Sequence, residues 1–330
     1  MYALSARQLA TLFGGLLALA GALFVLRALA GEWPLVLAST RGMRSEWLGG
    51  AFFFGFLGMS TIGLGWHKAL DLVGVLSKRR AALRWYFVGQ LGKYVPGGIW
   101  GLVGSVELAV GGGTSRARGY GAMLLALGAT YLAGVVTVAA LLPLDLGVLR
   151  GAPSVGLLLL LAPAGVMAVH PVALERVRAL ARRLSPVPIE LEVPTWGASL
   201  WLVGRHVPAW VGIGLATWFV TQALVAGGTL QNVMLASVLA WVVGFLVVPA
   251  PGGLGVREAV FVATATSLSP GMAAAVAIVS RVLFILVDVL GAVAMVTFEF
   301  VSGRRPCRAG EAKADLQPTR SADPDQGGHR

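Results

Sequence analysis

The sequence has little charge for its length, one cysteine and few histidines. Only 12% of its 330 residues are charged, 57% are hydrophobic, and the mean hydropathy is +0.79. A soluble domain carries about a quarter charged residues, so the composition excludes an ordinary soluble protein and indicates lipid as the solvent. The single cysteine, Cys307, excludes a disulfide framework within the chain. With four histidines, a zinc site is not expected.

Catalytic and nucleotide-binding signatures are also missing. The sequence has no Gly-x-Ser-x-Gly elbow, no Walker loop and no His-Glu-x-x-His pair. We therefore expect no enzyme activity, no catalytic residues, no metal and no cofactor. The net charge of +11 comes without an RNA-binding motif, so nucleic acid is not an expected partner. Basic residues between apolar runs instead orient a membrane protein and attract anionic lipid.

Long apolar runs predict an all-α fold, a polytopic transmembrane helical bundle of about eight spans, between about seven and nine. A tail at residues 302–330 is polar and is expected to be a disordered cytoplasmic segment, which leaves residues 1–301 as one integral membrane domain. The runs that we interpret as spans are residues 9–29, 47–66, 119–142, 155–169, 196–220, 233–248 and 273–298.

Two apolar segments are interrupted by glycine and proline, one in each half of the chain. Residues 85–110 contain Lys93 and Val95-Pro96-Gly97-Gly98, and the second half contains Ala250-Pro251-Gly252-Gly253, 155 residues later. Such interruptions break a helix, so we expect two re-entrant segments. Paired interruptions in two halves are typical of transporters built from an inverted repeat. A chance match in a chain with 45 glycines is the alternative.

The basic residues predict the orientation. They cluster at residues 78–84, 116–118, 176–183 and 304–308. Cytoplasmic loops are enriched in Lys and Arg, so we expect both termini in the cytoplasm of a cell with a bacterial-type inner membrane. Residues 174–184 have the pattern of a basic amphipathic helix on the inner leaflet.

Charged residues at the interruptions are the candidate substrate site. Backbone N–H groups of a broken loop together with an ammonium can hold a phosphate, which points to Lys93. A half-helix that begins near Val256 would favour an anion at its N-terminus, beside Arg257 and Glu258. The alternatives are that Lys93 snorkels to the interface and that Arg257 and Glu258 form a structural ion-pair network with Lys93 or Arg281. The predicted substrate-binding set is Lys93, Tyr94, Pro96, Gly97, Gly98, Pro251, Gly252, Gly253, Arg257 and Glu258.

Three further charges are candidates for a coupling or a structural role. Arg281 and Asp288 lie two turns apart on one helix face, about 10 Å, so each is expected to meet another helix. Glu107 is expected to pair with Arg116 or Arg118. Arg205 and His206 lie within a predicted span, and His206 is interpreted as a hydrogen-bonded core residue. Gln90 and Tyr94 are candidates for a polar cavity, with a core role as the alternative.

The two interrupted stretches carry a family resemblance. Gly92-Lys93-Tyr94-Val95-Pro96-Gly97-Gly98-Ile99-Trp100 and Pro251-Gly252-Gly253-Leu254-Gly255-Val256-Arg257-Glu258 resemble the signature stretches of the lysylphosphatidylglycerol synthase transmembrane-region family. Its members are also described as flippase-like proteins. The resemblance covers residues 5–300, and implies the membrane domain without the family's cytosolic aminoacyl-transferase domain. Synthase activity is therefore not expected.

These observations predict a lipid translocase. The expected substrate is an anionic lipid or a lipid-linked headgroup that moves between the leaflets. The first alternative is a non-transporting lipid-binding membrane partner of an envelope-biosynthesis enzyme, with a membrane enzyme or a second copy of the chain as its partner. The second is an embedded enzyme that acts on lipid phosphate, which the missing nucleophile and metal cluster disfavour.

Overall fold

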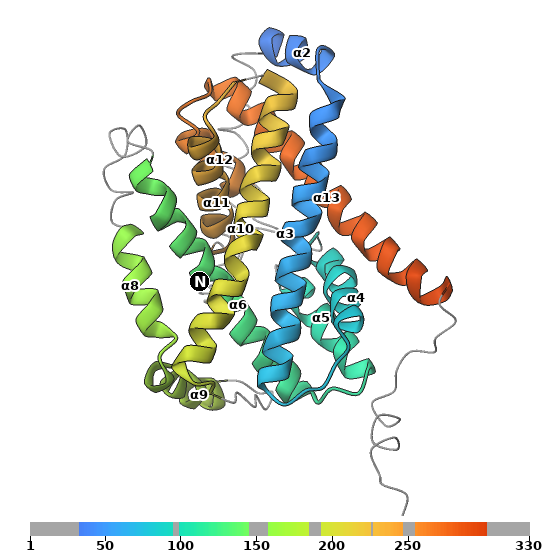
Figure 1. Cartoon of the computed structure of the whole chain (residues 1–330), viewed down its shortest axis with the longest axis vertical. Coiled ribbons are helices and arrows are strands. Elements are labelled where there is room, and N and C mark those ends of the chain that lie inside the picture. Colours follow the sequence, from blue (N-terminus) through green and yellow to red (C-terminus); the bar gives the residue numbers. More distant parts are fainter. Residues whose placement is uncertain are drawn as a thin grey trace, which may run out of the picture.

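The computed structural model describes residues 33–94, 99–144, 158–184, 193–225, 227–246 and 255–301. All regular elements in these ranges are helices (Figure 1). The expected span at residues 9–29, the tail at 302–330, and the two Pro-Gly-Gly loops lie outside the described residues. The predicted all-helical class is confirmed for the described part of the chain.

Four helices are long and apolar enough to cross a membrane, which agrees with the predicted membrane protein. They are α3 (Ser45–Leu72), α6 (Arg116–Leu141), α10 (Trp196–Val225) and α13 (Pro270–Val301). Each overlaps one of the predicted spans, which are residues 47–66, 119–142, 196–220 and 273–298. A 3-10 turn, η2 (Leu142–Leu144), follows α6, and a short helix, α2 (Trp33–Arg41), precedes α3.

Helices α3 and α10 form the central antiparallel pair (Figure 1). At one end, the Arg44 backbone N–H and guanidinium donate to the carbonyls of Ala223 and Gln222. In the middle, a Cβ on Gly58 would lie 2.9 Å from the carbonyl oxygen of Ala209. In a membrane, helices associate through close packing of their backbones, because lipid provides little hydrophobic driving force. Gly58 allows this close approach because it has no side chain.

The first interrupted segment is a helical hairpin. Helix α4 (Arg79–Gln90) leads through the 3-10 turn η1 (Leu91–Tyr94) to α5 (Trp100–Gly111), which packs along α4. Glycines let the two arms touch, because a Cβ on Gly89 would lie 2.5 Å from the backbone nitrogen of Ser105. The hairpin begins after α3 ends and leads into the start of α6, and Gly74 after α3 lies close to Arg118 of α6. Its open side therefore faces the end of the bundle where α3 ends.

The second interrupted segment is also a hairpin, formed by α11 (Leu230–Leu246) and α12 (Val256–Thr264). Residues 233–246 of the run that we interpreted as a span belong to α11, which is shorter than the four candidate spans. Its open side is closed by Asn232, whose side-chain amide donates to the Thr264 carbonyl at 3.1 Å and accepts from the Ser267 backbone N–H at 3.0 Å. The hairpin begins where α10 ends and leads into the start of α13. Because α3 and α10 are antiparallel, the two hairpins enter the bundle from opposite ends (Figure 1).

Two further helices lie beside this bundle. Helix α8 (Leu158–Ala168) packs on α6, and α9 (Pro171–Leu184) follows it. Helix α9 contains the predicted amphipathic segment, residues 174–184, and lies at the end of the bundle where α10 begins (Figure 1).

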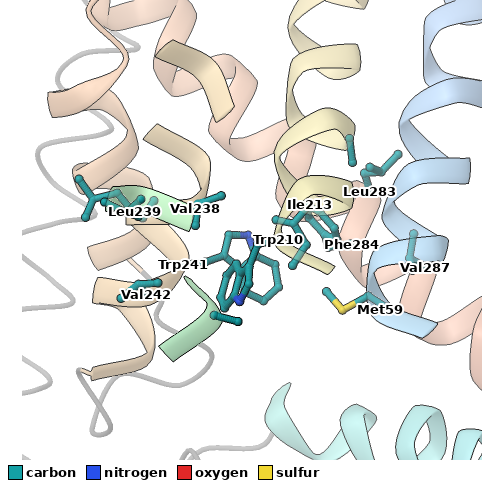
Figure 2. Packing of buried hydrophobic residues seen from close by; sticks show 14 of the residues in the cluster. Met59, Trp210, Ile213, Val238, Leu239, Trp241, Val242, Leu283, Phe284 and Val287 are labelled. Carbon is teal, nitrogen blue, oxygen red and sulfur yellow. The ribbon is translucent and has the colours of Figure 1, made fainter. Parts of the chain in front are cut away.

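Large buried side chains join the two halves at the centre of the bundle. Trp210 of α10, Trp241 of α11 and Phe284 of α13 turn toward the same region, with Met59 of α3 nearby (Figure 2). The Trp241 and Phe284 rings meet edge to face at 5.2 Å between centroids, an arrangement that stabilises aromatic pairs. The Trp210 indole N–H donates to the Thr130 carbonyl at 2.8 Å, which ties α10 to α6.

Candidate functional site

A cavity of about 200 Å³ lies between the tips of the two hairpins. Met59, Thr130, Trp210 and Phe284 line it, and each stands near the middle of its long helix. Most of the wall is apolar or aromatic. The polar and charged side chains other than tryptophan on the wall are Tyr86, Gln90, Lys93, Tyr94, Thr130, Tyr131, Arg257 and Arg281.

Lys93 reaches the cavity from the tip of the first hairpin. Its ammonium lies 2.6 Å from Oδ2 of Asp288, and the Tyr94 hydroxyl donates to the same oxygen at 2.5 Å. Asp288 is fully buried in α13. The ion pair joins the tip of the first hairpin to the last long helix, and it gives Asp288 the partner on another element that the sequence predicted.

Glu258 organises the tip of the second hairpin. Its Oε2 accepts the backbone N–H of Gly255 at 2.8 Å, and its Oε1 forms an ion pair with Arg281. Gly255 has a φ of +78°, a conformation that is strained for residues with a side chain. A carboxylate in the first turn is favoured by the helix dipole, so Glu258 fixes the start of α12. The pair also confirms that Arg281 meets another helix.

Arg257 differs from these paired charges. Its guanidinium carbon lies 3.4 Å from the centroid of the Trp241 ring, a cation–π contact. No carboxylate among the described residues lies within ion-pair distance of Arg257. The two adjacent loops outside the described ranges, residues 95–98 and 247–254, contain no Asp or Glu. A Cβ on Gly244 would overlap the Arg257 side chain, so glycine makes the room that Arg257 occupies.

The charges around the cavity do not cancel. Lys93, Arg257 and Arg281 contribute three positive charges and line the cavity, whereas Asp288 and Glu258 contribute two negative charges and lie outside the described lining. The sum over these five side chains is one positive charge. Cations at a partly buried surface with aromatic walls favour an anionic ligand, and Arg257 offers N–H donors that suit an oxyanion.

Several other predicted residues lie away from the cavity. Glu107 accepts hydrogen bonds from Arg116, the closest at 2.8 Å, and from the Tyr120 hydroxyl at 3.3 Å. This confirms one of its two expected partners and gives Glu107 an exposed ion pair at the turn between α5 and α6. His206 is a buried residue whose Nδ1 lies 2.8 Å from the Leu202 carbonyl. Arg205 is exposed, with its guanidinium carbon 4.7 Å from the Trp201 ring centroid.

Four of the ten residues in the predicted substrate-binding set can be placed. Lys93, Tyr94 and Arg257 line the cavity, and Glu258 lies directly behind it. Pro96, Gly97, Gly98, Pro251, Gly252 and Gly253 lie outside the described residues. Gln90 and Tyr94 line the cavity, as one of the two readings predicted. Trp241 and Gly244, which position Arg257, carry no local sequence signal that separates them from other apolar span residues.

No model of a protein family matches the chain, and no curated protein matches it. Among the described residues, no group of three or more His, Cys, Asp and Glu side chains could hold a metal ion. The function proposed below therefore rests on the residues that line the cavity.

Proposed function

We propose that the protein translocates an anionic lipid or a lipid-linked anionic headgroup across a bacterial-type inner membrane. The observation that carries this proposal is the position of Arg257. It lies at the tip of an interrupted hairpin, lines a cavity at mid-length of the long helices, and has no described carboxylate at ion-pair distance. Keeping such a charge at membrane depth is costly, and a bound anion would offset that cost.

Two similar units support a transport role. In the first, the order is long helix, hairpin, long helix, from α3 through α4 and α5 to α6. In the second, the same order runs from α10 through α11 and α12 to α13. We interpret the units as an inverted repeat, which extends the predicted fold. Transporters of this kind bind substrate at the repeat interface and open it alternately to the two sides.

Basic residues support an orientation for the two units. Lys78, Arg80 and Arg116 lie at the bundle end where α3 ends, and the Arg80 guanidinium lies over the Phe298 ring near the end of α13. Arg41 and Arg44 are at the opposite end. The positive-inside rule then places the open side of the first hairpin and the end of α13 in the cytoplasm. The second hairpin would open to the outside.

The cavity walls favour a lipid over a free anion. Aromatic and aliphatic side chains such as Met59, Leu102 and Phe284 form most of the lining. A volume of about 200 Å³ is smaller than the about 300–1,000 Å³ of a typical ligand pocket, so it suits a headgroup while acyl chains stay in the bilayer. We also propose that the chain is a relative of the lysylphosphatidylglycerol synthase transmembrane-region family, on the two stretches that resemble its signatures.

Leaflet exchange in reconstituted vesicles tests the proposal. Purified full-length protein is placed in vesicles that contain a fluorescent analogue of an anionic or a zwitterionic phospholipid, and the outer-leaflet label is quenched chemically. We expect the protein to accelerate exchange of the anionic analogue over protein-free vesicles. Exchange no faster than in protein-free vesicles, for a panel of anionic lipids, would refute translocation. Lipid that binds without exchanging would favour the non-transporting partner.

A further inference from the structure

Two buried carboxylates lie behind the cavity, and their surroundings differ. Both oxygens of Glu258 have partners, the Gly255 N–H and the Arg281 guanidinium. Both contacts of Asp288 instead fall on Oδ2, from Lys93 and Tyr94. Its other oxygen, Oδ1, is buried and has no hydrogen-bond partner among the described residues. Glu258 is therefore held as part of a helix start, whereas Asp288 depends on one cation and one hydroxyl.

The cation that neutralises Asp288 faces the cavity. Lys93 lines the cavity and keeps 17% of its side chain exposed, whereas Asp288 is 0% exposed. An anion that enters the cavity beside Arg257 competes with Asp288 for the same ammonium. When Lys93 turns to the anion, Asp288 is left as a buried carboxylate without a cation at ion-pair distance. A buried charge in that state is strongly unfavourable, and carboxylates in such places bind a proton instead.

We propose that Asp288 takes up a proton when an anion binds Lys93, so that the anion and a proton move together. This inference rests on the proposed translocation. The Asp288 carboxylate forms an O–H bond with a proton that comes from the bulk solution through water in the cavity, and Lys93 remains an ammonium. When the anion leaves, Lys93 returns to Asp288 and the proton returns to water. With a singly charged anion the cycle carries no net charge.

Tyr94 connects Asp288 to the cavity. It lines the cavity and its hydroxyl donates to Asp288 Oδ2, so the hydroxyl can pass a proton between cavity water and the buried carboxylate. The exchange needs no opening of the helix bundle around α13. Tyr94 is a positioning and relay residue in this scheme, whereas Asp288 is the group that changes its protonation state.

The other groups near Asp288 do not replace Lys93. The negative charge of Asp288 also acts electrostatically on Tyr86 of α4 and on Arg257 of α12. Arg281 lies two turns away from Asp288 on the same helix. Neither arginine lies within ion-pair distance of Asp288. Next to Asp288, helix α3 packs at Gly55, where an added Cβ would contact three apolar side chains: Val287 and Phe284 of α13, and Ala216 of α10. The protonation of Asp288 should therefore follow the position of Lys93.

Proton uptake on anion binding tests the inference. Full-length protein in nanodiscs of zwitterionic lipid is mixed with dihexanoyl phosphatidylglycerol, and protons are counted with a pH-sensitive dye in weak buffer. Infrared difference spectra report the carbonyl band of a protonated carboxylic acid. We expect about one proton per bound anion in the wild type, and none in Asp288→Asn, which still binds the probe. Glu107→Gln, which removes an exposed paired carboxylate outside the cavity, should behave as wild type.

A second variant keeps the test decisive if Asp288→Asn does not fold. In Lys93→Gln, Asp288 has lost its cation, so we expect the carbonyl band before any probe is added and no further band afterwards. Probe binding to the wild type without proton uptake would overturn the proton coupling and leave translocation standing, as would the same uptake by Asp288→Asn. No probe binding by the wild type would overturn the anion site and this inference with it.

Discussion

Replacing Arg257 by glutamine should weaken anion binding strongly and change stability little. The guanidinium lies over Trp241 and has no described carboxylate at ion-pair distance. Removing it therefore leaves no buried carboxylate without its partner. The loss to the fold is one cation–π contact, about 0.5–2 kcal/mol. The loss to the ligand is a hydrogen bond with a charged group, about 1.5–3 kcal/mol, or about 10- to 150-fold in affinity.

Arg281 provides the contrast in stability. It forms an ion pair with Glu258, which is buried. Arg281→Gln leaves that carboxylate without its cation, and breaking a buried pair costs about 3–5 kcal/mol. Arg257→Gln should therefore unfold close to the wild-type temperature, whereas Arg281→Gln should unfold well below it. Because the two arginines line one cavity, a difference in unfolding temperature between the two variants reports the ion pair between Arg281 and Glu258.

Two measurements on the same nanodisc samples check this prediction. Calorimetric titration with dihexanoyl phosphatidylglycerol gives the affinity, and the thermal unfolding midpoint gives the stability. Arg205→Gln is the matched control, because Arg205 also lies over a tryptophan, Trp201, but is exposed and outside the described lining of the cavity. Unchanged affinity in Arg257→Gln would refute the anion site. A midpoint as low as that of Arg281→Gln would refute the claim that no carboxylate depends on Arg257 as its ion-pair partner among the described residues.

Three further outcomes are expected. Gly244→Ala keeps every charge but displaces the Arg257 side chain, so anion affinity should fall toward that of Arg257→Gln; wild-type affinity would contradict this. Adding Glu258→Gln to Arg281→Gln removes both charges of the pair, so most of the lost thermal stability should return, unless the pair contributes more than charge balance. A Lys78→Cys variant without the native cysteine should react with an impermeant thiol reagent only from the cytoplasmic side. Labelling from outside would show that the orientation is opposite to the one proposed.

The first hairpin and the place of the second interruption could be predicted from the sequence because their signal is local, whereas the first arm of the second hairpin, α11, was interpreted as a span. Glycine and proline interrupt apolar segments, and the interruptions coincide with Lys93 and Arg257. The spacing of Arg281 and Asp288 also correctly predicted that they do not pair with each other. The Lys93 ammonium lies 2.6 Å from the buried Asp288, whereas the snorkelling alternative expected it at the membrane interface.

The cavity itself could not be predicted from the sequence. Its walls come from all four long helices and from both hairpins, and nothing local marks Thr130 or Trp241 as neighbours of Lys93 and Arg257. The sequence also did not decide the partner of Glu258: the ion pair with Arg281 that the structure shows was one of two alternatives. Which cation meets which carboxylate depends on how two hairpins from opposite ends pack together, and that packing follows from contacts between distant segments.

The most direct test of the central claim is the exchange rate of an anionic lipid analogue in vesicles that hold equal amounts of wild type, Arg257→Gln or Arg205→Gln. We expect wild type and Arg205→Gln to exchange the analogue at similar rates above protein-free vesicles, and Arg257→Gln to be slower by about 10- to 150-fold. Equal rates for all three proteins would contradict a translocation site at Arg257, and rates equal to protein-free vesicles would contradict translocation itself.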